Sequence, residues 1–351
     1  RPAEYPAALL YFTGSKEHNV RLREIAKGLG LRLNEYGLFR ESGAAGGAAA
    51  LPVEAADEAG IYRALGLCFV PPEVREDTGE IEAAAAGKLP RFVELADLRG
   101  DLHIHSRWSD GQDGIAALAE EAVRRGLEYI AITDHSRTLA FARGLTPERL
   151  AQQGEEIAAL NRAGAGIRIL RGCEVEILGD GSLDTPDEVL EKLDFVVAAV
   201  HNPVRRDGLD LTARLTRAAQ HPLVDVIAHP TGRIIGEREE YPVDAARLIE
   251  AAARTGVALE LNASPHRLDL PPRLVRQAAA AGVPIAISTD AHDCRNLAGL
   301  EIGVRAARRG WLTPEEALNS LPLDGLISWR QERVGARGRP ATSRGGPSGA
   351  N

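Results

Sequence analysis

Histidine and carboxylate residues recur in this chain where runs of apolar residues end. The first run ends in Asp101–Ser106, where His103 and His105 stand two residues apart, and Asp110 follows shortly after. Residues two apart on a strand point to the same face, so the two imidazoles would lie side by side, as two ligands of one metal ion must. A single pair of this kind is weak evidence, because strand histidines more often have ordinary hydrogen-bond partners.

Five later apolar runs end in the same residue types, and this recurrence changes the interpretation. Together the six runs hold six of the nine histidines of the chain. Nine nitrogen and oxygen donors exceed what one ion can bind, and at about four to six ligands per ion they suit two or three divalent ions. The set lacks thiolate and fits Zn, Mn or Fe, with Mn favoured by the carboxylates. The nine candidate ligands are His103, His105, Asp110, His135, Glu174, His201, His229, Asp290 and His292.

Ions held this close together would support phosphoester hydrolysis. They lower the pKa of a bridging water, so the predicted nucleophile is a metal-bound hydroxide, and they hold the non-bridging oxygens of a phosphate. Arg137, Arg233 and Arg267 lie in predicted loops beside these runs and suit bidentate phosphate contacts, although a loop arginine is often only a solvated charge. Arg205 and Arg206 are weaker candidates for holding DNA farther out.

The elements that must position these residues begin at about Gly100, where apolar runs start to alternate with helical stretches. Near-continuous apolar strands separated by helices indicate a parallel sheet, and seven such units favour a barrel over an open doubly wound sheet. All strand ends of a barrel meet at one rim, so the candidate ligands would converge there. The expected strands are 101–105, 129–134, 167–174, 195–201, 224–229, 257–262 and 284–290; the expected helices between them are 114–125, 147–163, 185–193, 211–221, 245–255 and 273–281.

The regions around the predicted barrel have other patterns. Residues 1–71 read as a small α+β unit, with a helix over 16–29, a strand over 31–39, a loop over 42–50 and a short helix over 61–67. Residues 72–98 are rich in acidic residues and alanine and are expected to be a solvated linker. The barrel unit is placed at 99–334, with two last helices over 297–309 and 314–320, and the Gly/Pro/Ser/Arg-rich residues 335–351 are expected to be disordered.

Composition excludes several classes of protein. No apolar run approaches the roughly 20 residues of a membrane span, and from the residues at the start we expect no secretory signal. Cys68, Cys173 and Cys294 are too widely spaced for a disulfide framework, which favours a reducing cytoplasm. The net charge of −8 gives no global attraction to nucleic acid, although buried carboxylate ligands contribute to that sum. Because the chain starts at Arg1 and has no methionine, we expect it to be a processed chain or a fragment.

Residues from about 100 to 330 resemble the PHP (polymerase and histidinol phosphatase) family. The matching motifs are DLHIHSRWSDG, ITDHS, GCEVEI, AAVHN, IAHP and STDAH. The resemblance implies a distorted seven-stranded (β/α)7 barrel with a trinuclear metal site. It also implies that the nine candidate residues are the ligands, with Glu174 chosen over its neighbour Glu176. Since all nine positions are filled, nothing predicts a metal-free member.

The first unit resembles the thumb of X-family DNA polymerases, through Tyr11-Phe-Thr-Gly-Ser15, Asn34-Glu-Tyr36 and Ile61-Tyr-Arg-Ala-Leu-Gly66. The resemblance implies that Tyr11 and Phe12 face a nucleotide and that Gly14 allows a tight turn, and Lys16 could touch the DNA backbone. Bacterial members of that family carry a PHP domain after the thumb. Their catalytic palm would precede Arg1, so we do not expect this chain to polymerise.

The resemblance implies a Mn-dependent 3′–5′ exonuclease of DNA repair, with 3′-phosphatase or abasic-site endonuclease activity as related possibilities. The expected partners are DNA, as primer 3′ ends and gapped or damaged duplex, and polymerase domains outside this chain. The expected place is the cytoplasm, at the nucleoid. Two alternatives stay open: a small-molecule phosphatase of the histidinol phosphate type, and a PHP platform without catalysis.

Overall fold

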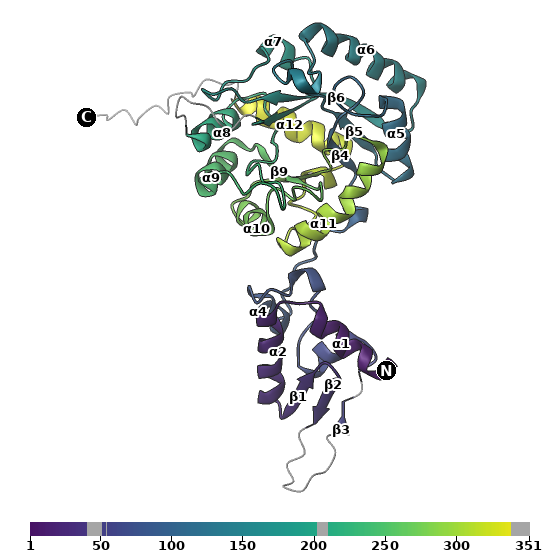
Figure 1. Cartoon of the computed structure of the whole chain (residues 1–351), viewed down its shortest axis with the longest axis vertical. Coiled ribbons are helices and arrows are strands. Elements are labelled where there is room, and N and C mark those ends of the chain that lie inside the picture. The colour runs from purple at the N-terminus through teal and green to yellow at the C-terminus, as the bar shows by residue number, and fades with distance from the viewer. Residues whose placement is uncertain (41–50, 54, 202–209, 338–351) are drawn as a thin grey trace, which may run out of the picture. The chain divides into compact units, whose positions relative to one another are not determined.

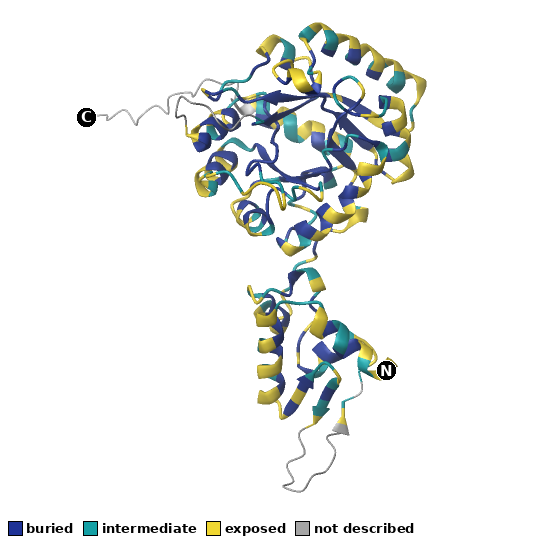
Figure 2. Ribbon diagram, viewed as in Figure 1, coloured by how far each residue is buried: buried dark blue, intermediate teal, exposed yellow. Residues whose placement is uncertain are grey.

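The computed structural model describes residues 1–40, 51–53, 55–201 and 210–337. The chain folds into two compact units, Arg1–Phe92 and Val93–Asn351 (Figure 1). Buried residues concentrate on the strands and on the inward faces of the helices, while exposed residues lie on the outer helix faces (Figure 2). Each unit therefore has its own core and is described separately.

The first unit is a three-stranded antiparallel sheet with helices. It contains η1 (Pro2–Glu4), α1 (Tyr5–Phe12), α2 (Lys16–Gly28), β1 (Leu31–Asn34), β2 (Gly37–Arg40), β3 (Leu51–Pro52), α3 (Glu58–Ala64), η2 (Pro72–Val74) and α4 (Glu80–Ala85). Helix α2 begins at Ser15, whose hydroxyl accepts the backbone N–H of His18. The prediction of one strand over 31–39 is wrong, because the chain turns after Asn34 and pairs β1 with β2. The alternation of apolar residues continues through the two-residue turn and conceals it.

Residues 72–92 belong to this unit, so the prediction of a solvated linker there is wrong. Arg75 and Glu80 are fully buried. The Glu80 carboxylate lies 2.6 Å from Nδ1 of His18 and accepts the backbone N–H groups of Asp77 and Thr78. The acidic composition of this segment conceals charges that are paired in the interior. The expected small α+β architecture of the first unit is confirmed, and the predicted loop over 42–50 lies outside the described residues.

The second unit is an almost closed barrel of seven parallel strands. The strands lie in chain order, and every neighbouring pair in the sheet is parallel. Between the first and last strands, Ile104 and Ala291 form an isolated bridge and the backbone N–H of His105 donates to the Ala291 carbonyl. The predicted (β/α)7 barrel is thus confirmed. Its strands are β4 (Gly100–Ile104), β5 (Tyr129–Ile132), β6 (Arg168–Glu176), β7 (Phe195–Ala199), β8 (Val226–Ile227), β9 (Ala258–Asn262) and β10 (Ile285–Ser288).

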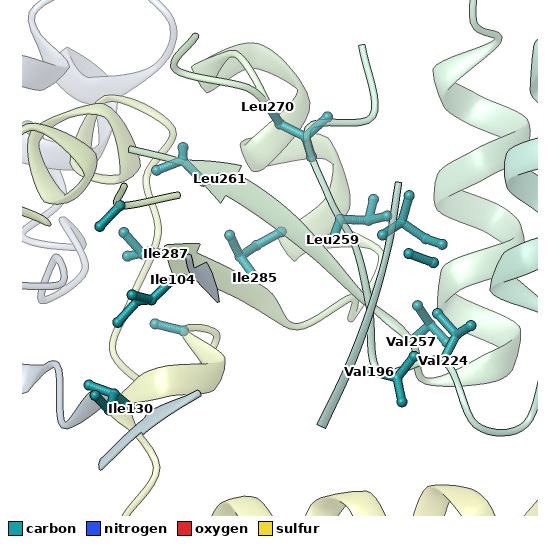
Figure 3. Packing of buried hydrophobic residues seen from close by; sticks show 14 of the residues in the cluster. Ile104, Ile130, Val196, Val224, Val257, Leu259, Leu261, Leu270, Ile285 and Ile287 are labelled. Atoms are coloured by element: carbon teal, nitrogen blue, oxygen red, sulfur yellow. The ribbon is translucent and has the colours of Figure 1, made fainter. Parts of the chain in front are cut away.

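Helices surround the barrel and pack on the outer side of its strands. Figure 3 shows part of this layer, in which Ile130, Leu259 and Ile285 belong to one buried cluster. The same cluster includes Leu248 and Leu274 from two helices. The elements are η3 (Leu95–Asp97), α5 (Ile115–Arg124), η4 (Ala140–Ala142), α6 (Pro147–Ala163), α7 (Asp187–Leu190), α8 (Leu211–Ala219), α9 (Ala245–Thr255), α10 (Pro272–Ala280), η5 (Cys294–Ala298), α11 (Gly299–Arg309), η6 (Leu318–Ser320) and α12 (Leu323–Arg337).

Two predicted helices are shorter than expected. Over 185–193 only α7 is helical, because the backbone tightens into i→i+3 hydrogen bonds such as Leu193 N–H to the Leu190 carbonyl. Over 314–320 the helix is interrupted where Ala317 forms a bridge with Ile285. This segment is therefore held at the start of β10 and keeps only the 3₁₀ turn η6.

Helix α12 was not predicted, and it closes the amino-terminal end of the barrel. Its Leu326 belongs to the interior cluster that includes Tyr129 and Phe195, the first residues of β5 and β7. Its last three residues, 335–337, were expected to be disordered, so that part of the prediction is wrong; residues 338–351 lie outside the described residues. None of the described helices has the length and apolar composition that a membrane crossing requires.

Candidate metal centre

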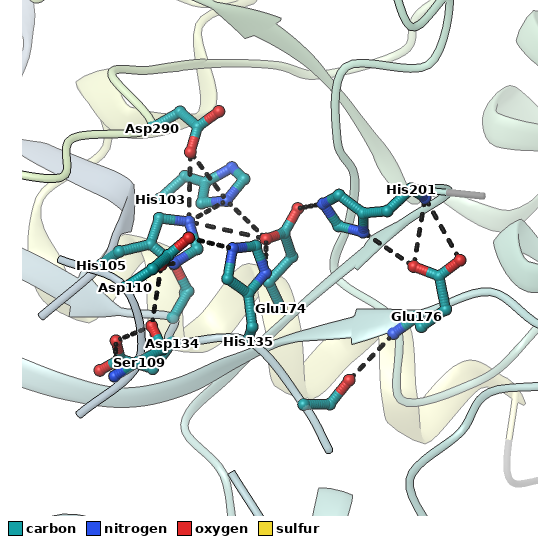
Figure 4. Close-up of polar contacts among 12 residues, drawn as sticks. His103, His105, Ser109, Asp110, Asp134, His135, Glu174, Glu176, His201 and Asp290 are labelled. Atoms are coloured by element: carbon teal, nitrogen blue, oxygen red, sulfur yellow. Dashed lines mark hydrogen bonds and ion pairs between the residues drawn. The ribbon is translucent and has the colours of Figure 1, made fainter. Parts of the chain in front are cut away.

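All nine predicted ligands meet at the carboxyl ends of the barrel strands. Figure 4 shows most of them around Glu174, which lies at the end of β6. Three groups of these residues place donor atoms within 4.8 Å of one another, and the groups share members. The sequence placed eight of these residues at strand ends and Asp110 in the loop after the first strand, and the nearly closed barrel brings those ends together.

The first group consists of His103, His105 and Asp290. The Nε2 atoms of the two histidines are 3.1 Å apart, and Oδ1 of Asp290 is 3.1 Å from Nε2 of His105. Neighbouring ligands of an ion with metal–nitrogen bonds of about 2.1 Å lie roughly 3–3.4 Å apart. The two imidazoles predicted to lie side by side therefore have the spacing of two ligands on one ion.

The second group consists of His105, Asp110, His135 and His292. Its centre is the Asp110 carboxylate, which lies 3.4 Å from Nε2 of His135 through Oδ2 and 3.4 Å from Nε2 of His292 through Oδ1. Nδ1 of His105 is 3.9 Å from Oδ1 of the same carboxylate. His105 thus presents one ring nitrogen to each of the first two groups.

The third group is built on Glu174 with His135 and His201. Oε2 of Glu174 is 2.7 Å from Nδ1 of His135, and Oε1 is 3.3 Å from Nε2 of His201. Nε2 of His229 is 3.0 Å from the same Oε1. Oε2 is also 3.5 Å from Nε2 of His103, so Glu174 is placed to bridge ions.

These residues fit divalent metal ions. Nδ1 of His105, Nδ1 of His135 and Oε2 of Glu174 are buried atoms that make no hydrogen bond, although the last two form an ion pair at 2.7 Å. Buried polar atoms are rarely left without partners, and a metal would serve all three. The donors are imidazole nitrogens and carboxylate oxygens, which suit Zn, Mn or Fe.

Electrostatics favour the metal-binding form of Glu174 and of His105. Burial alone would raise the pKa of Glu174, but His201, His103 and His135 hold that pKa well below its usual range, so the group is a carboxylate. Burial, with a contribution from His135, lowers the pKa of His105 to about 3, so its imidazole is neutral. Metal ligation requires an ionised carboxylate and a neutral imidazole. At His135 and His201 burial alone would lower the pKa, but Glu174 raises it to about 10 and about 9, so a metal ion would displace protons from these two imidazoles.

Comparison with known proteins assigns the two units. The first matches the family model of the DNA polymerase beta thumb over residues 8–76, and the second matches the PHP domain over residues 101–264. A probable phosphatase of Syntrophotalea carbinolica (strain DSM 2380 / NBRC 103641 / GraBd1) is 30% identical, with 62% of this chain and 90% of that protein covered. The chain belongs to the PHP family.

The thumb relates this PHP chain to a second family, the X-family DNA polymerases. The DNA polymerase/3′-5′ exonuclease PolX of Bacillus subtilis (strain 168) is 44% identical over 320 residues, which cover 91% of this chain and 55% of that protein. The chain thus spans about half the length of that relative, and the predicted kinship with PHP-bearing X-family DNA polymerases is confirmed. A crystal structure of histidinol phosphate phosphatase from Lactococcus lactis subsp. lactis Il1403, complexed with Zn, L-histidinol and phosphate, aligns with a TM-score of 0.42 at 17% identity, covering 60% of this chain and 93% of that one.

Two glutamates of the PHP unit contact the Nδ1 atoms of candidate ligand histidines. Oε1 of Glu260 lies 2.7 Å from Nδ1 of His103, and its Oε2 accepts the backbone N–H of His229. Oε2 of Glu176 lies 2.7 Å from Nδ1 of His201. Glu176 had been weighed only as a competitor of Glu174, and sequence reasoning missed Glu260. The sequence feature that could have revealed Glu260 is its place as a charged residue inside the apolar run of β9. That strand is the only barrel strand that ends without a predicted ligand.

The loop after β4 is fixed by Asp134, which lies just beyond β5. Its carboxylate accepts the backbone N–H of Ser106 at 2.8 Å and the hydroxyls of Ser106 and Ser109. These contacts hold the backbone immediately before Asp110. The Asp110 carboxylate, at the centre of the second group, is therefore positioned by the buried Asp134.

The predicted phosphate-binding arginines have different surroundings. Arg267 lies at the site, with its Nε 3.6 Å from Oδ2 of Asp290. Arg233 donates instead to the backbone carbonyls of Arg267 and Leu268 and braces that loop. Arg137 is exposed in the loop after His135. Arg205 and Arg206 lie outside the described residues.

The predicted thumb contacts lie near the start of α2. Phe12 is 77% exposed and Tyr11 is 37% exposed, so both rings are accessible to a partner. A Cβ added at Gly14 would lie 3.1 Å from Cβ of Arg75, which explains the small residue at this turn. Lys16 is exposed in the first turn of α2.

Proposed function

We propose that this chain hydrolyses phosphodiester bonds at DNA 3′ ends with divalent metal ions, as a 3′–5′ exonuclease of DNA repair. The observation that carries the proposal is the convergence of nine imidazole and carboxylate side chains in a PHP unit that follows a polymerase thumb in the same chain. The thumb gives the PHP unit a DNA-binding neighbour. A phosphatase of small molecules has no need of one.

The three donor groups would hold two or three ions, with Mn favoured because carboxylate oxygens join the imidazoles. When bound, divalent ions supply Lewis-acid stabilisation of phosphate charge and make water more acidic. The chain's own residues set the rest of the reaction. Negative charge at the site comes from the carboxylates of Asp110, Glu174 and Asp290. The imidazoles of His103 and His201 are oriented through their second ring nitrogen by Glu260 and Glu176.

Arginine and aromatic side chains would hold the DNA. Arg267, 3.6 Å from Asp290, places a permanent positive charge where a substrate phosphate would approach the ligands. In the thumb, Phe12 and Tyr11 offer exposed rings for a nucleotide, and Lys16 offers a charge for a backbone phosphate. We assign Arg137 to the same phosphate-holding role, since it follows His135 and is exposed.

A second candidate is hydrolysis of a small phosphomonoester. The similarity to the probable phosphatase of Syntrophotalea carbinolica, which extends over 90% of that protein, favours it. Removal of a 3′-phosphate from DNA and cleavage at abasic sites use the same metal chemistry and are included in the proposal. A platform without catalysis is disfavoured, because every candidate ligand is present and three of the buried donor atoms make no hydrogen bond.

The test compares four substrates in the presence of Mn²⁺: DNA duplexes with a 3′-hydroxyl, a 3′-phosphate or an abasic site, and a small phosphomonoester. We expect release of nucleotides from the 3′-hydroxyl end, and loss of this activity and of bound metal in His103→Ala. His221→Ala is the matched control, because His221 contacts Asp187 outside the cluster. Turnover of the monoester alone would overturn the DNA assignment, and wild-type nuclease activity in His103→Ala would overturn the site.

We also propose that the chain works beside polymerase domains in the cytoplasm, at the nucleoid. The 44% identity to PolX supports the first part, since the chain covers only 55% of that protein. The unpaired state of Cys68, Cys173 and Cys294 supports a reducing compartment.

A further inference from the structure

The loop between β5 and α6 leaves an aromatic side chain in solvent. Phe141, in the 3₁₀ turn η4, is 85% exposed, the largest fraction among the large apolar side chains that the structure describes. Its neighbours Leu139, Ala142 and Leu145 are buried. The loop is therefore packed against the barrel through these three residues, and Phe141 is its one large apolar side chain that stays exposed.

The base of this loop is fixed at a candidate metal ligand. The backbone N–H of Leu145 donates to the His135 carbonyl at 2.7 Å, and Ser136 and Leu145 form a β-bridge. The two limbs are so close that a Cβ added at Gly144 would lie 1.9 Å from the Ser136 carbonyl oxygen. Phe141 is six residues from His135, so its backbone lies within roughly 20 Å of the ligands.

Further hydrogen bonds hold both limbs of the loop. The buried carboxylate of Asp184 accepts the Ser136 hydroxyl at 2.7 Å and the backbone N–H of Thr138 at 3.2 Å. On the other limb, Arg149 donates to the carbonyl of Arg143 at 2.8 Å and to that of Trp108 at 2.6 Å. The turn that carries Phe141 is thus presented on a braced support at the metal-bearing rim.

Two arginines flank the exposed ring in this loop. Arg137 and Arg143 are both exposed, and the pKa of the exposed Glu148 is lowered by a hydrogen bond with Thr146 and, to a smaller extent, by the charge of Arg137. An exposed aromatic ring with arginines on both sides of it in the sequence is a combination that binds single-stranded nucleic acid, since the ring stacks on a base and the arginines contact the backbone. The positive charge of this segment selects an anionic partner.

We propose that Phe141 stacks on an unpaired base at the 3′ end of DNA, while Arg137 and Arg143 contact the adjacent phosphates. The inference rests on the proposed function and adds a residue that would engage its substrate: Phe141, reading a 3′ end whose last base is unpaired. Stacking would hold a strand whose terminal phosphodiester lies at the ligands. A paired terminal base would be engaged by its complement and could not occupy this position.

Binding without divalent metal tests the inference apart from catalysis. Affinities are measured for a 5′-labelled single strand and for the same strand with abasic residues at its last three positions. We expect wild-type protein to bind the base-bearing strand more tightly, and Phe141→Ala and Phe141→Leu to lose that preference by roughly 5- to 150-fold. Phe141→Trp should retain it. Ile302→Ala, on an exposed apolar residue of α11, is the matched control and should bind like wild type.

The same variants are then assayed for Mn-dependent release from the 3′ end, where kcat/KM should fall for the base-bearing strand and not for the abasic one. Equal affinity of wild type for the two strands, or equal losses on both strands in Phe141→Ala, would overturn the stacking. A retained base preference with no hydrolysis of either strand would support the stacking and overturn the exonuclease instead. A wild-type affinity in Phe141→Leu would show that an apolar contact, rather than an aromatic ring, is what binds.

Discussion

Oε1 of Glu260 lies 2.7 Å from Nδ1 of His103, and both side chains are fully buried. The other carboxylate oxygen accepts the backbone N–H of His229 at 2.7 Å, so one residue of β9 holds two candidate ligands, one on β4 and one that follows β8. The amide of Asn262, on the same strand, contacts Asp290 at 3.0 Å. The barrel strand that contributes no ligand therefore orients ligands that other strands contribute.

Glu260→Gln should lower metal content as well as activity. The amide keeps the volume of the side chain but loses the charge that orients His103, and such outer contacts typically contribute about 10- to 100-fold in metal affinity. We expect a lower Mn²⁺ or Zn²⁺ stoichiometry by elemental analysis and weaker binding by titration. Glu176→Gln is the comparison variant, because Glu176 holds a different candidate ligand, His201. If Glu260→Gln bound metal as wild type does, its role as an orienting residue would be excluded.

Arg267→Ala should reduce phosphoester hydrolysis and leave the metal in place. Its Nε lies 3.6 Å from Asp290, and a guanidinium there would meet a substrate phosphate with two parallel N–H donors, which lysine does not offer. We expect kcat/KM to fall roughly 10- to 200-fold, in line with a charge-assisted hydrogen bond of about 1.5–3 kcal/mol. Arg267→Lys should recover part of the loss. Reduced metal stoichiometry in Arg267→Ala would instead mean that the arginine supports Asp290.

Most of the barrel and its ligand set could be predicted because both depend on local patterns. Apolar runs of strand length gave the seven strands, and a histidine or carboxylate after a run, as at His229 or Asp290, needs no knowledge of long-range contacts. The parallel order then brings those residues to one rim. The resemblance of the motifs to the PHP family supported the same assignment.

What the sequence did not reveal depends on contacts between distant residues. Glu260 is 157 positions from His103 in the sequence, and only the closure of the barrel brings the two side chains into contact. Glu80 lies in an acidic segment that looks solvated, yet its partner His18 is 62 positions away. Helix α12 is weakly amphipathic, and its role in closing the barrel depends on Asp225, which no local pattern connects to it.

Asp225→Ala should destabilise the PHP unit strongly. Asp225 is fully buried, and it accepts hydrogen bonds from Arg330 and Arg333 of α12 and from the backbone N–H of Val196. Removing the carboxylate leaves the buried Arg333 without its partner, a change that typically costs about 3–5 kcal/mol. Denaturant unfolding followed by tryptophan fluorescence measures the loss. Glu250→Ala, which breaks an exposed pair on α9, is the control and should cost about 0–0.5 kcal/mol. Similar losses in the two variants would show that the pair does not anchor α12.

The thumb should lose stability in acid because of Glu80. Burial alone would raise the pKa of this carboxyl, but the hydrogen bonds from His18, Thr78 and Asp77 outweigh it and lower the pKa below the usual 4.5. A carboxyl whose pKa is lower in the folded state stabilises the fold above its unfolded pKa, and this stability is lost as pH falls through the folded value. Unfolding of the thumb, followed by amide hydrogen exchange, should therefore become easier as pH is lowered from about 5. Glu80→Gln should be less stable than wild type at pH 7, and its stability should depend less on pH in the acid range. If its stability fell with pH as that of wild type does, Glu80 would be ruled out as the source of the acid sensitivity.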